Sequence, residues 1–170
     1  MSSIDEVRRK GAWLFAVGIL ALTTAASGDD WSRQFAPAAR FHQLQDFDYE
    51  AALDRETRLV WEIQSSERDM VWDVAKSHCA SREVGGRLGW RLPAIEELAS
   101  LVDPDELAPA LPAGHPFLGV LHGIYWSSTS SSLHPASALI VNFELGFVSA
   151  LNTANEVRVR CVRGGPGFDG

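Results

Sequence analysis

Two cysteines, Cys79 and Cys161, carry the most reactive side chains of this 170-residue sequence. A thiolate can act as a nucleophile or a metal ligand, whereas two thiols can form a disulfide. With two cysteines only one intramolecular pairing exists, and it spans 161 − 79 = 82 residues. The chain-entropy model gives such a closed loop roughly 4–5 kcal/mol of stabilisation. We predict this disulfide; the alternative is two unpaired, buried thiols.

The histidines do not have the spacing of a metal site. No H-x3-H or H-E-x-x-H pattern occurs among the five of them, which are His42, His78, His115, His122 and His134. The sequence also has no Gly-x-Ser-x-Gly elbow and no P-loop. We therefore expect no metal, no cofactor and no enzymatic activity.

A polar stretch at residues 127–136 offers groups that could contact a ligand. It follows a proline-rich region, residues 103–122, which predicts a long irregular loop, and such loops often carry function. We predict a ligand face made by these loops, with the following candidate residues: Trp126, Ser127, Ser128, His134 and Asn142.

Three further tryptophans and one arginine are interpreted as structural. Trp61, Trp72 and Trp90 sit in periodic segments, which favours core packing over sugar stacking, and the same holds for Trp126 apart from its polar neighbours. Arg91 can pair with Glu96 or Glu97 of the following segment, because a buried arginine almost always has a partner. The alternative for Arg91 is a ligand contact.

The overall charge argues against two classes of partner. The formal net charge is −7, with an isoelectric point near 5.2, so bulk charge does not attract the chain to nucleic acid or to anionic lipid. We expect no nucleic-acid partner.

The first 28 residues are typical of a signal peptide. Arg8, Arg9 and Lys10 precede an apolar run, and small residues follow at 25–28. The alternative is a retained anchor through residues 11–26, the only membrane contact we expect. The prediction is an exported protein, periplasmic, cell-surface or secreted, with a linker at 29–40, a domain at 41–165 and a flexible tail at 166–170.

The first half of the domain predicts one hairpin and two helices. Tyr49–Asp54 and Arg58–Ile63 flank a polar turn, as in a β-hairpin. Val71–Arg82 has a helical apolar stripe that includes Cys79. A short extended run, Leu88–Leu92, leads to a second helix over Ala94–Val102, with Pro93 at its start.

The second half predicts strands only. Ile124–Ser128 is strand-like, and a second hairpin joins Ala138–Phe143 to Phe147–Leu151. Glu156–Arg163 alternates, which places Cys161 on the apolar face of a last strand. The chain is therefore predicted to be an α+β domain of two helices packed on antiparallel hairpins, with a long irregular loop region.

Six ordered motifs resemble the Lcl C-terminal domain-like family, a bacterial family of unknown function. They cover residues 49–165 and are Trp61, Trp72…Cys79, GWRLPAIEELASLVD (89–103), YWSST (125–129), VNFELGFVS (141–149) and VRCVRGG (159–165). The resemblance implies a fold related to C-type-lectin-like and sulfatase-modifying-factor domains. In such folds the first helix is commonly disulfide-bonded to the last strand.

Two positions of this chain depart from the family pattern. Ala94 replaces a threonine common in the family, which removes a helix cap worth ~1 kcal/mol. The second hairpin turn, often Asn-Gly in the family, is Leu145-Gly146 here, and Gly146 keeps the positive-φ position. The calcium motifs of sugar-binding C-type lectins are absent, and Asn142 with Glu144 supplies too few oxygens for Ca²⁺.

The resemblance implies ligand binding rather than one shared activity. We expect an exported, non-enzymatic binding module for a glycan or an envelope or extracellular protein. The alternatives are a structural or assembly subunit of a cell-surface complex and, less favoured, an enzyme of the formylglycine-generating type, for which a reactive thiol would be required.

Overall fold

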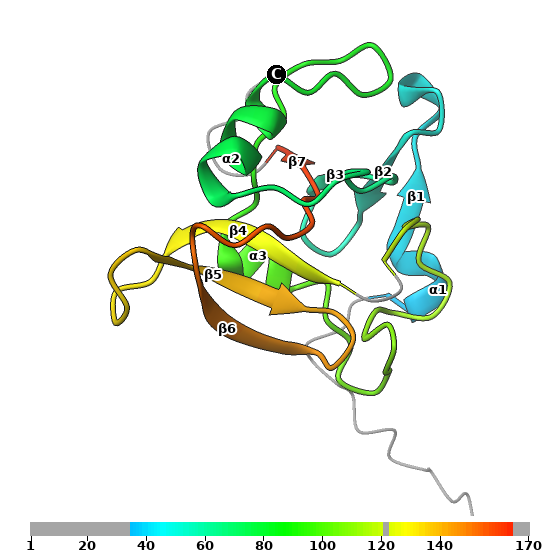
Figure 1. Ribbon diagram of the computed structural model, residues 1–170. Coiled ribbons are helices and arrows are strands. Elements are labelled where there is room, and N and C mark those ends of the chain that lie inside the picture. The colour runs from blue at the N-terminus through cyan, green and yellow to red at the C-terminus, as the bar shows by residue number, and fades with distance from the viewer. Residues whose placement is uncertain (1–34, 121–122, 165–170) are drawn as a thin grey trace, which may run out of the picture. The chain divides into compact units, whose positions relative to one another are not determined.

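The computed structural model describes residues 35–120 and 123–164 (Figure 1). The chain divides into two units, Met1–Trp31 and Ser32–Gly170, and every described residue belongs to the second. The predicted signal peptide, the predicted tail and His122 lie outside the described residues. No helix among the described residues is long and apolar enough to span a membrane.

A four-stranded antiparallel sheet has the order β1-β2-β3-β7. Its strands are β1 (Phe41–Gln43), β2 (Ala51–Asp54), β3 (Val60–Glu62) and β7 (Val162–Arg163). The first predicted hairpin is confirmed as β2–β3. Asp54 stabilises its turn, since its carboxylate accepts the Glu56 N–H at 3.0 Å and the Thr57 hydroxyl at 2.9 Å.

The predicted linker, residues 29–40, is described from residue 35, and its end is folded. Helix α1 (Pro37–Arg40) leads directly into β1. Arg40 is buried and donates two hydrogen bonds, of 3.0 and 2.7 Å, to the Asp54 carboxylate. The ordered domain therefore begins before Phe41.

A three-stranded antiparallel sheet has the order β4-β5-β6. Its strands are β4 (Ile124–Ser130), β5 (Ser137–Asn142) and β6 (Phe147–Asn152). The second predicted hairpin is confirmed as β5–β6, with Asn142 opposite Phe147. Gly146 closes its turn at φ 71°, the left-handed conformation that favours glycine.

The two predicted helices are present, and both are shorter than predicted. Helix α2 (Trp72–Ala80) buries Ala75 and Cys79. Helix α3 covers only Ile95–Ala99 of the predicted 94–102, because the Ser100 hydroxyl bonds the Glu97 carbonyl at 2.7 Å and the chain leaves the helix there. A single 3₁₀ turn, η1 (Gln45–Phe47), joins β1 to β2.

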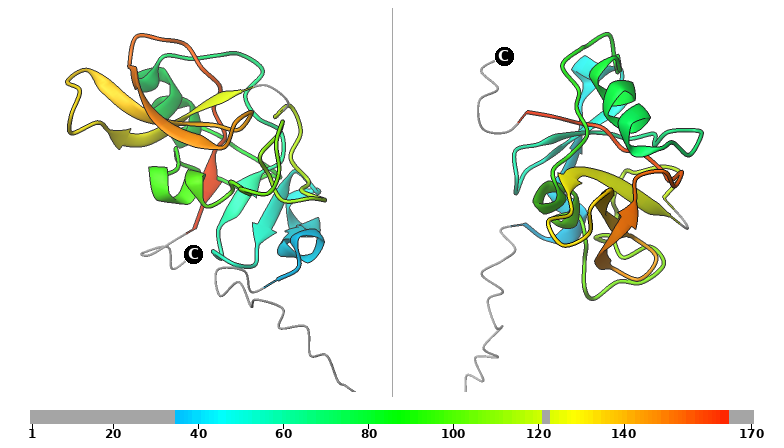
Figure 2. Two further views of the ribbon diagram at one scale, coloured as in Figure 1. Left: turned by 90° about the horizontal axis from the view of Figure 1, so that it is seen from below. Right: turned by 60° about the vertical axis from the view of Figure 1, so that its left-hand side comes forward.

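The last segment differs from its prediction. We predicted one strand over Glu156–Arg163, but only Val162–Arg163 is strand, as β7. The reason is that the segment passes from one sheet to the other: Arg158 bridges β4 at Tyr125, and Val162 pairs with Trp61 of β3. Figure 2 shows this last segment running between the two sheets.

The core has two apolar clusters. One surrounds Cys79, Cys161 and Trp126, and the other surrounds Trp61 and Phe143. Helix α2 packs on β4, and α3 packs on β4 and β5. Residues 103–120 contain no helix or strand, although Leu111, Phe117 and Val120 enter the second cluster. The fold is thus α+β, with two antiparallel sheets, few helices and one disulfide.

Candidate functional site

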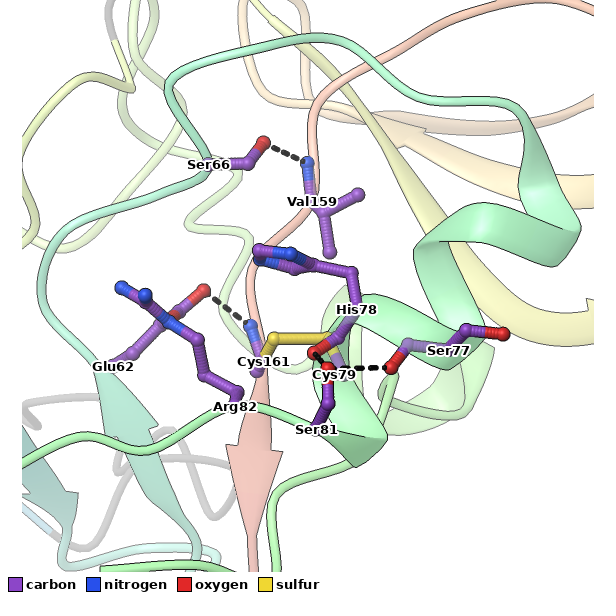
Figure 3. The surroundings of a disulfide bond; sticks show 9 residues. All are labelled: Glu62, Ser66, Ser77, His78, Cys79, Ser81, Arg82, Val159 and Cys161. Carbon is purple, nitrogen blue, oxygen red and sulfur yellow. Dashed lines mark hydrogen bonds and ion pairs between the residues drawn. A yellow bond between two sulfur atoms is a disulfide. The ribbon is translucent and has the colours of Figure 1, made fainter. Parts of the chain in front are cut away.

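The disulfide joins helix α2 to the last segment of the chain within the first apolar cluster. Cys79 of α2 and Cys161 of the last segment are bonded with an S–S distance of 2.07 Å and a Cα–Cα distance of 5.5 Å, and both are fully buried (Figure 3). The predicted pairing is confirmed. Because the sequence has no other cysteine, no thiol remains for nucleophilic chemistry.

A groove of two adjoining hollows lies beside this disulfide. The larger hollow has a volume of about 390 Å³ and the smaller one about 300 Å³, and Gln64 and Arg82 line both. Volumes of this order lie at the lower end of the range for small-molecule sites. The larger hollow is lined further by Tyr49, Glu50, Glu62, Ile63, Glu83, Val84 and Leu118, and the smaller one by Ser65, Ser66, Glu67, Arg68, Met70 and His78.

One wall of the groove is the segment that leaves β3. Ser66 fixes it to the last segment twice: its N–H donates to the Val159 carbonyl at 2.9 Å, and its hydroxyl accepts the Val159 N–H at 3.0 Å. Met70 and Val157 exchange two backbone hydrogen bonds: the Met70 N–H donates to the Val157 carbonyl at 2.9 Å, and the Val157 N–H donates to the Met70 carbonyl at 3.1 Å. The opposite wall is the C-terminal end of α2, which the disulfide ties to the last segment of the chain at Cys161.

An ion pair between the buried Glu62 and the partly exposed Arg82 lies between the two walls. The carboxylate of Glu62 is 3.0 Å from Nε of Arg82 and accepts the Cys161 N–H at 2.7 Å. Only 1% of the Glu62 side chain is exposed. Burial raises the pKa of Glu62 above its usual value, even though the Cys161 N–H, Arg82 and nearby Arg160 all favour the ionised form.

Arg160 lies beneath this pair and has a structural role. It is fully buried and donates to the carbonyls of Glu62, Ile63 and Leu118 at 2.6, 2.7 and 3.0 Å. Its guanidinium stacks 4.6 Å from the Phe117 ring centroid, and burial lowers its pKa. The bonded carbonyls rigidify the chain on which the groove is built.

Two polar atoms at the groove lack partners. Among the described residues, the buried side-chain atoms without a hydrogen bond are Trp61 Nε1, Ser65 Oγ and His78 Nε2. Ser65 is 1% exposed, and both Ser65 and His78 line the smaller hollow. Figure 3 shows the His78 ring directed toward the segment Val159–Cys161. A buried group without a partner costs stability, so each such atom indicates a place where a ligand atom or water can bind.

The structure does not bring the predicted ligand face together as one surface. Trp126 and Ser127 are fully buried, and their side chains donate to the carbonyls of Met70 and Leu139 at 2.8 and 2.7 Å. Asn142 accepts the N–H groups of the β5–β6 turn, and His134 is exposed at the far tip of the β4–β5 loop. Ser128 is half-buried, with its N–H bonded to the Pro93 carbonyl. Sequence periodicity missed the groove because its residues come from segments without a shared motif.

The tryptophan and arginine motif residues stabilise the fold. Arg91 pairs with Glu97 rather than Glu96, through hydrogen bonds of 2.7 and 2.6 Å. Trp90 and Pro93 are buried, and the Trp90 indole donates to the Arg87 carbonyl at 2.8 Å. The indole of the half-buried Trp72 donates to the Ser127 carbonyl at 2.7 Å and stacks under the ammonium group of Lys76.

Thr129 of β4 partly supplies the cap that Ala94 lacks. Its hydroxyl accepts the Ile95 N–H at 3.0 Å, at the first turn of α3. The Glu97 carboxylate accepts the Ala94 N–H at 2.8 Å. Two orphan donors at the helix start are therefore satisfied without a threonine at position 94.

The groove has no metal-binding geometry. Within residues 35–120 and 123–164, no group of three or more His, Cys, Asp or Glu side chains is arranged to hold a metal ion.

The region from β2 to β7 carries both cysteines, both hairpins and nearly all of the groove. The profile of the Lcl C-terminal domain matches residues 50–163, which is this region. The chain belongs to the Lcl C-terminal domain family. No curated protein matches the chain. The groove of this Lcl C-terminal domain falls inside the matched residues except for Tyr49, which lies one residue before them.

Proposed function

We propose that this Lcl C-terminal domain is an exported, non-enzymatic binding module of C-type-lectin-like fold. In this proposal its ligand, a glycan or a protein of the cell envelope, occupies the groove between the end of α2 and the segment after β3. The observation that supports this proposal most directly is the pair of buried polar atoms without a hydrogen-bond partner, Ser65 Oγ and His78 Nε2, on the wall of an open hollow.

The disulfide supports both export and the absence of thiol chemistry. Disulfides persist in oxidising compartments, which agrees with the signal-peptide pattern of the sequence. An enzyme of the formylglycine-generating type needs a reactive thiol, and both cysteines are bonded. The link from the first long helix to the last segment is also the arrangement expected of C-type-lectin-like domains.

Binding in the groove can be tested by blocking the junction of its two hollows. Gln64 is exposed and lines both, so Gln64→Trp fills the junction without touching the core. Ser132→Trp, at an exposed position in the β4–β5 loop, is the matched control. Each purified variant is applied to a glycan array and used as bait in a pull-down from the native envelope.

We expect the wild type and Ser132→Trp to retain a ligand that Gln64→Trp loses, at unchanged melting temperature. Equal retention by all three proteins would place the ligand elsewhere on the domain. Fractionation of the native cells tests export separately, since an exported domain is recovered outside the cytoplasm with its disulfide intact.

A structural or assembly subunit is the second candidate, and strand β6 favours it. Among the described residues β6 pairs only with β5, so its outer edge is open. Phe147 and Val148 on this edge are 44% and 47% exposed. An open, apolar edge strand is a common site of strand addition between chains. One stoichiometric protein partner, retained by Gln64→Trp and lost on Val148→Lys, would favour this candidate over groove binding.

A further inference from the structure

The larger hollow of the groove has an aromatic wall. Tyr49 lines it with its side chain 56% exposed, next to Glu50, Gln64 and Glu83. A tyrosine ring offers a flat apolar face for the C–H side of a ring-shaped ligand, and its hydroxyl remains available for hydrogen bonding. Carboxylate and amide oxygens around it accept hydrogen bonds from hydroxyl groups.

Tyr49 is held in an unfavourable backbone conformation. Its φ is 61°, directly after Asp48 at φ 51°, although a bulky residue rarely adopts the left-handed region. The Tyr49 N–H donates to the Leu44 carbonyl at 3.1 Å, and the Glu50 N–H donates to the Phe47 carbonyl at 2.8 Å. These bonds hold the exposed ring at the mouth of the hollow at a cost in stability, which is typical of functional positions.

The lining of the larger hollow carries the carboxylates of Glu50, Glu62 and Glu83 against the guanidinium of Arg82, and the buried Arg160 adds a second positive charge beneath them. The positive charge of Arg82 is neutralised by Glu62, with which it forms an ion pair at 3.0 Å. Glu50 and Glu83 remain, and Glu50 also accepts the Gly85 N–H at 2.8 Å. In the larger hollow this excess of carboxylates disfavours anionic groups such as uronic acids, sulfates and phosphates, whereas neutral hydroxyl groups find acceptors.

The smaller hollow adds the groups that an adjacent unit of the ligand would meet. Ser65 Oγ, on a side chain that is almost completely buried, and His78 Nε2 have no partner there. Gln64 and Arg82 line both hollows, so a ligand long enough to pass them contacts both. A chain of hydroxylated rings fits this arrangement of an aromatic face, several acceptors and two unpartnered polar atoms.

We infer that the groove binds a neutral oligosaccharide of at least two sugar units. One sugar stacks on Tyr49 in the larger hollow, and the hydroxyl groups of the next unit bond Ser65 and His78 in the smaller one. The inference rests on the proposed function, because it assigns the ligand class to the same groove.

Calorimetric titration of the full chain tests this inference. The probes are neutral cello-, chito-, malto- and manno-oligosaccharides of two to six units, and oligosaccharides of polygalacturonate and alginate as anionic probes. We expect at least one neutral series to bind and both anionic series to fail. Tyr49→Ala should weaken the neutral binding about tenfold or more, whereas Tyr49→Phe, which keeps the ring, should change it by less than about threefold. Phe147→Ala removes an aromatic ring that is exposed on β6 and should change nothing.

The outcomes separate the inference from the proposed function. Binding of an anionic series that Gln64→Trp abolishes, or capture of a protein that Gln64→Trp loses, overturns the neutral-sugar inference and keeps the groove as a binding site. Neutral-sugar binding that tolerates Tyr49→Ala overturns the inference as well. If no probe and no envelope component depends on Gln64, both proposals fail.

Discussion

Arg91 and Glu97 form two parallel hydrogen bonds, of 2.7 and 2.6 Å, between the extended run and helix α3. The same carboxylate accepts the Ala94 N–H, and the same guanidinium donates to the Gly164 carbonyl at 2.8 Å. One ion pair therefore joins a helix start to the end of the last strand. Burial alone would raise the pKa of Glu97, but the bonds from Arg91 and Ala94 outweigh it and lower the pKa below 4.5.

The first prediction is a pH-dependent loss of stability on Glu97→Gln. An acid whose pKa is lowered by folding stabilises the fold above its unfolded pKa, and this contribution disappears as pH falls through the folded pKa. We expect Glu97→Gln to lower the free energy of unfolding by about 1–2 kcal/mol at pH 7, with the difference from wild type shrinking below pH 4.5. Urea denaturation across this pH range measures it.

Glu96→Gln is the control for this prediction. Glu96 is exposed on the same helix turn and should change the free energy of unfolding by less than about 0.5 kcal/mol. A difference between Glu97→Gln and wild type that stays constant from pH 7 to pH 3 would contradict the assigned role of the carboxylate.

The second prediction contrasts two arginines of the last segment. Arg160→Ala removes a donor from three carbonyls, of which those of Glu62 and Ile63 are buried, so we expect a loss of about 3 kcal/mol or more in the free energy of unfolding. Arg158 pairs at 2.9 Å with the half-exposed Asp69, and Arg158→Ala should cost less than about 1 kcal/mol. Chemical denaturation of both variants measures the two losses in free energy of unfolding. Losses of similar size would refute the structural role of Arg160.

The contrast between these arginines shows where sequence periodicity reaches its limit. Alternation correctly predicted that Cys161 is buried, but it does not distinguish Arg158 from Arg160. Arg160 is buried because the segment passes between two sheets and is covered on both sides. A local sequence pattern cannot predict burial by residues that are far away in the sequence.

The candidate site was less predictable than the fold. Cysteine count, hairpin alternation and the glycine at position 146 depend on nearby residues, and these predictions are confirmed in outline. The groove instead depends on the path of the chain after β3 and on the buried carboxylate of Glu62, which alternation would place in solvent beside Trp61. The periodic position of Trp126 favoured core packing and its polar neighbours made it a ligand-face candidate; the fold buries it completely.

The third prediction concerns the disulfide. Reduction, or the double change Cys79→Ala and Cys161→Ala, should lower the free energy of unfolding by about 2–5 kcal/mol, because the bond closes a loop between residues 82 apart. Without reductant, the mass of the native protein should be two hydrogens below that of the reduced chain. The double variant is its own control, since reductant should not change its stability.

The fourth prediction separates the stability of the domain from its binding at Tyr49. Tyr49→Gly relieves a left-handed conformation that costs an ordinary residue roughly 1–2 kcal/mol. Because glycine also loses more backbone entropy on folding, we expect a net gain of up to about 1 kcal/mol in the free energy of unfolding. Neutral-sugar binding should nevertheless be lost, and thermal melting with calorimetric titration measures both effects.

Arg58→Gly is the matched control for that prediction. Arg58 has φ 63°, close to the 61° of Tyr49, but lies in the β2–β3 turn away from the groove-lining residues. The free energy of unfolding of Arg58→Gly should rise by a similar amount, while its neutral-sugar binding stays unchanged. If Tyr49→Gly lowered the free energy of unfolding and Arg58→Gly did not, the Tyr49 ring would contribute to the stability of the fold rather than to ligand binding.

The covalent link between Cys79 and Cys161 also sets how far the domain can be stretched. A pull on both ends of the folded region can extend only the residues before Cys79 and after Cys161, because the bond bypasses everything between them. One wall of the groove, the segment after β3, belongs to the extensible part. The other wall, the C-terminal end of α2, lies at the disulfide. Under mechanical load the groove would therefore open, whereas helix α3 and the three-stranded sheet, whose residues all lie between Cys79 and Cys161, would stay within the enclosed loop.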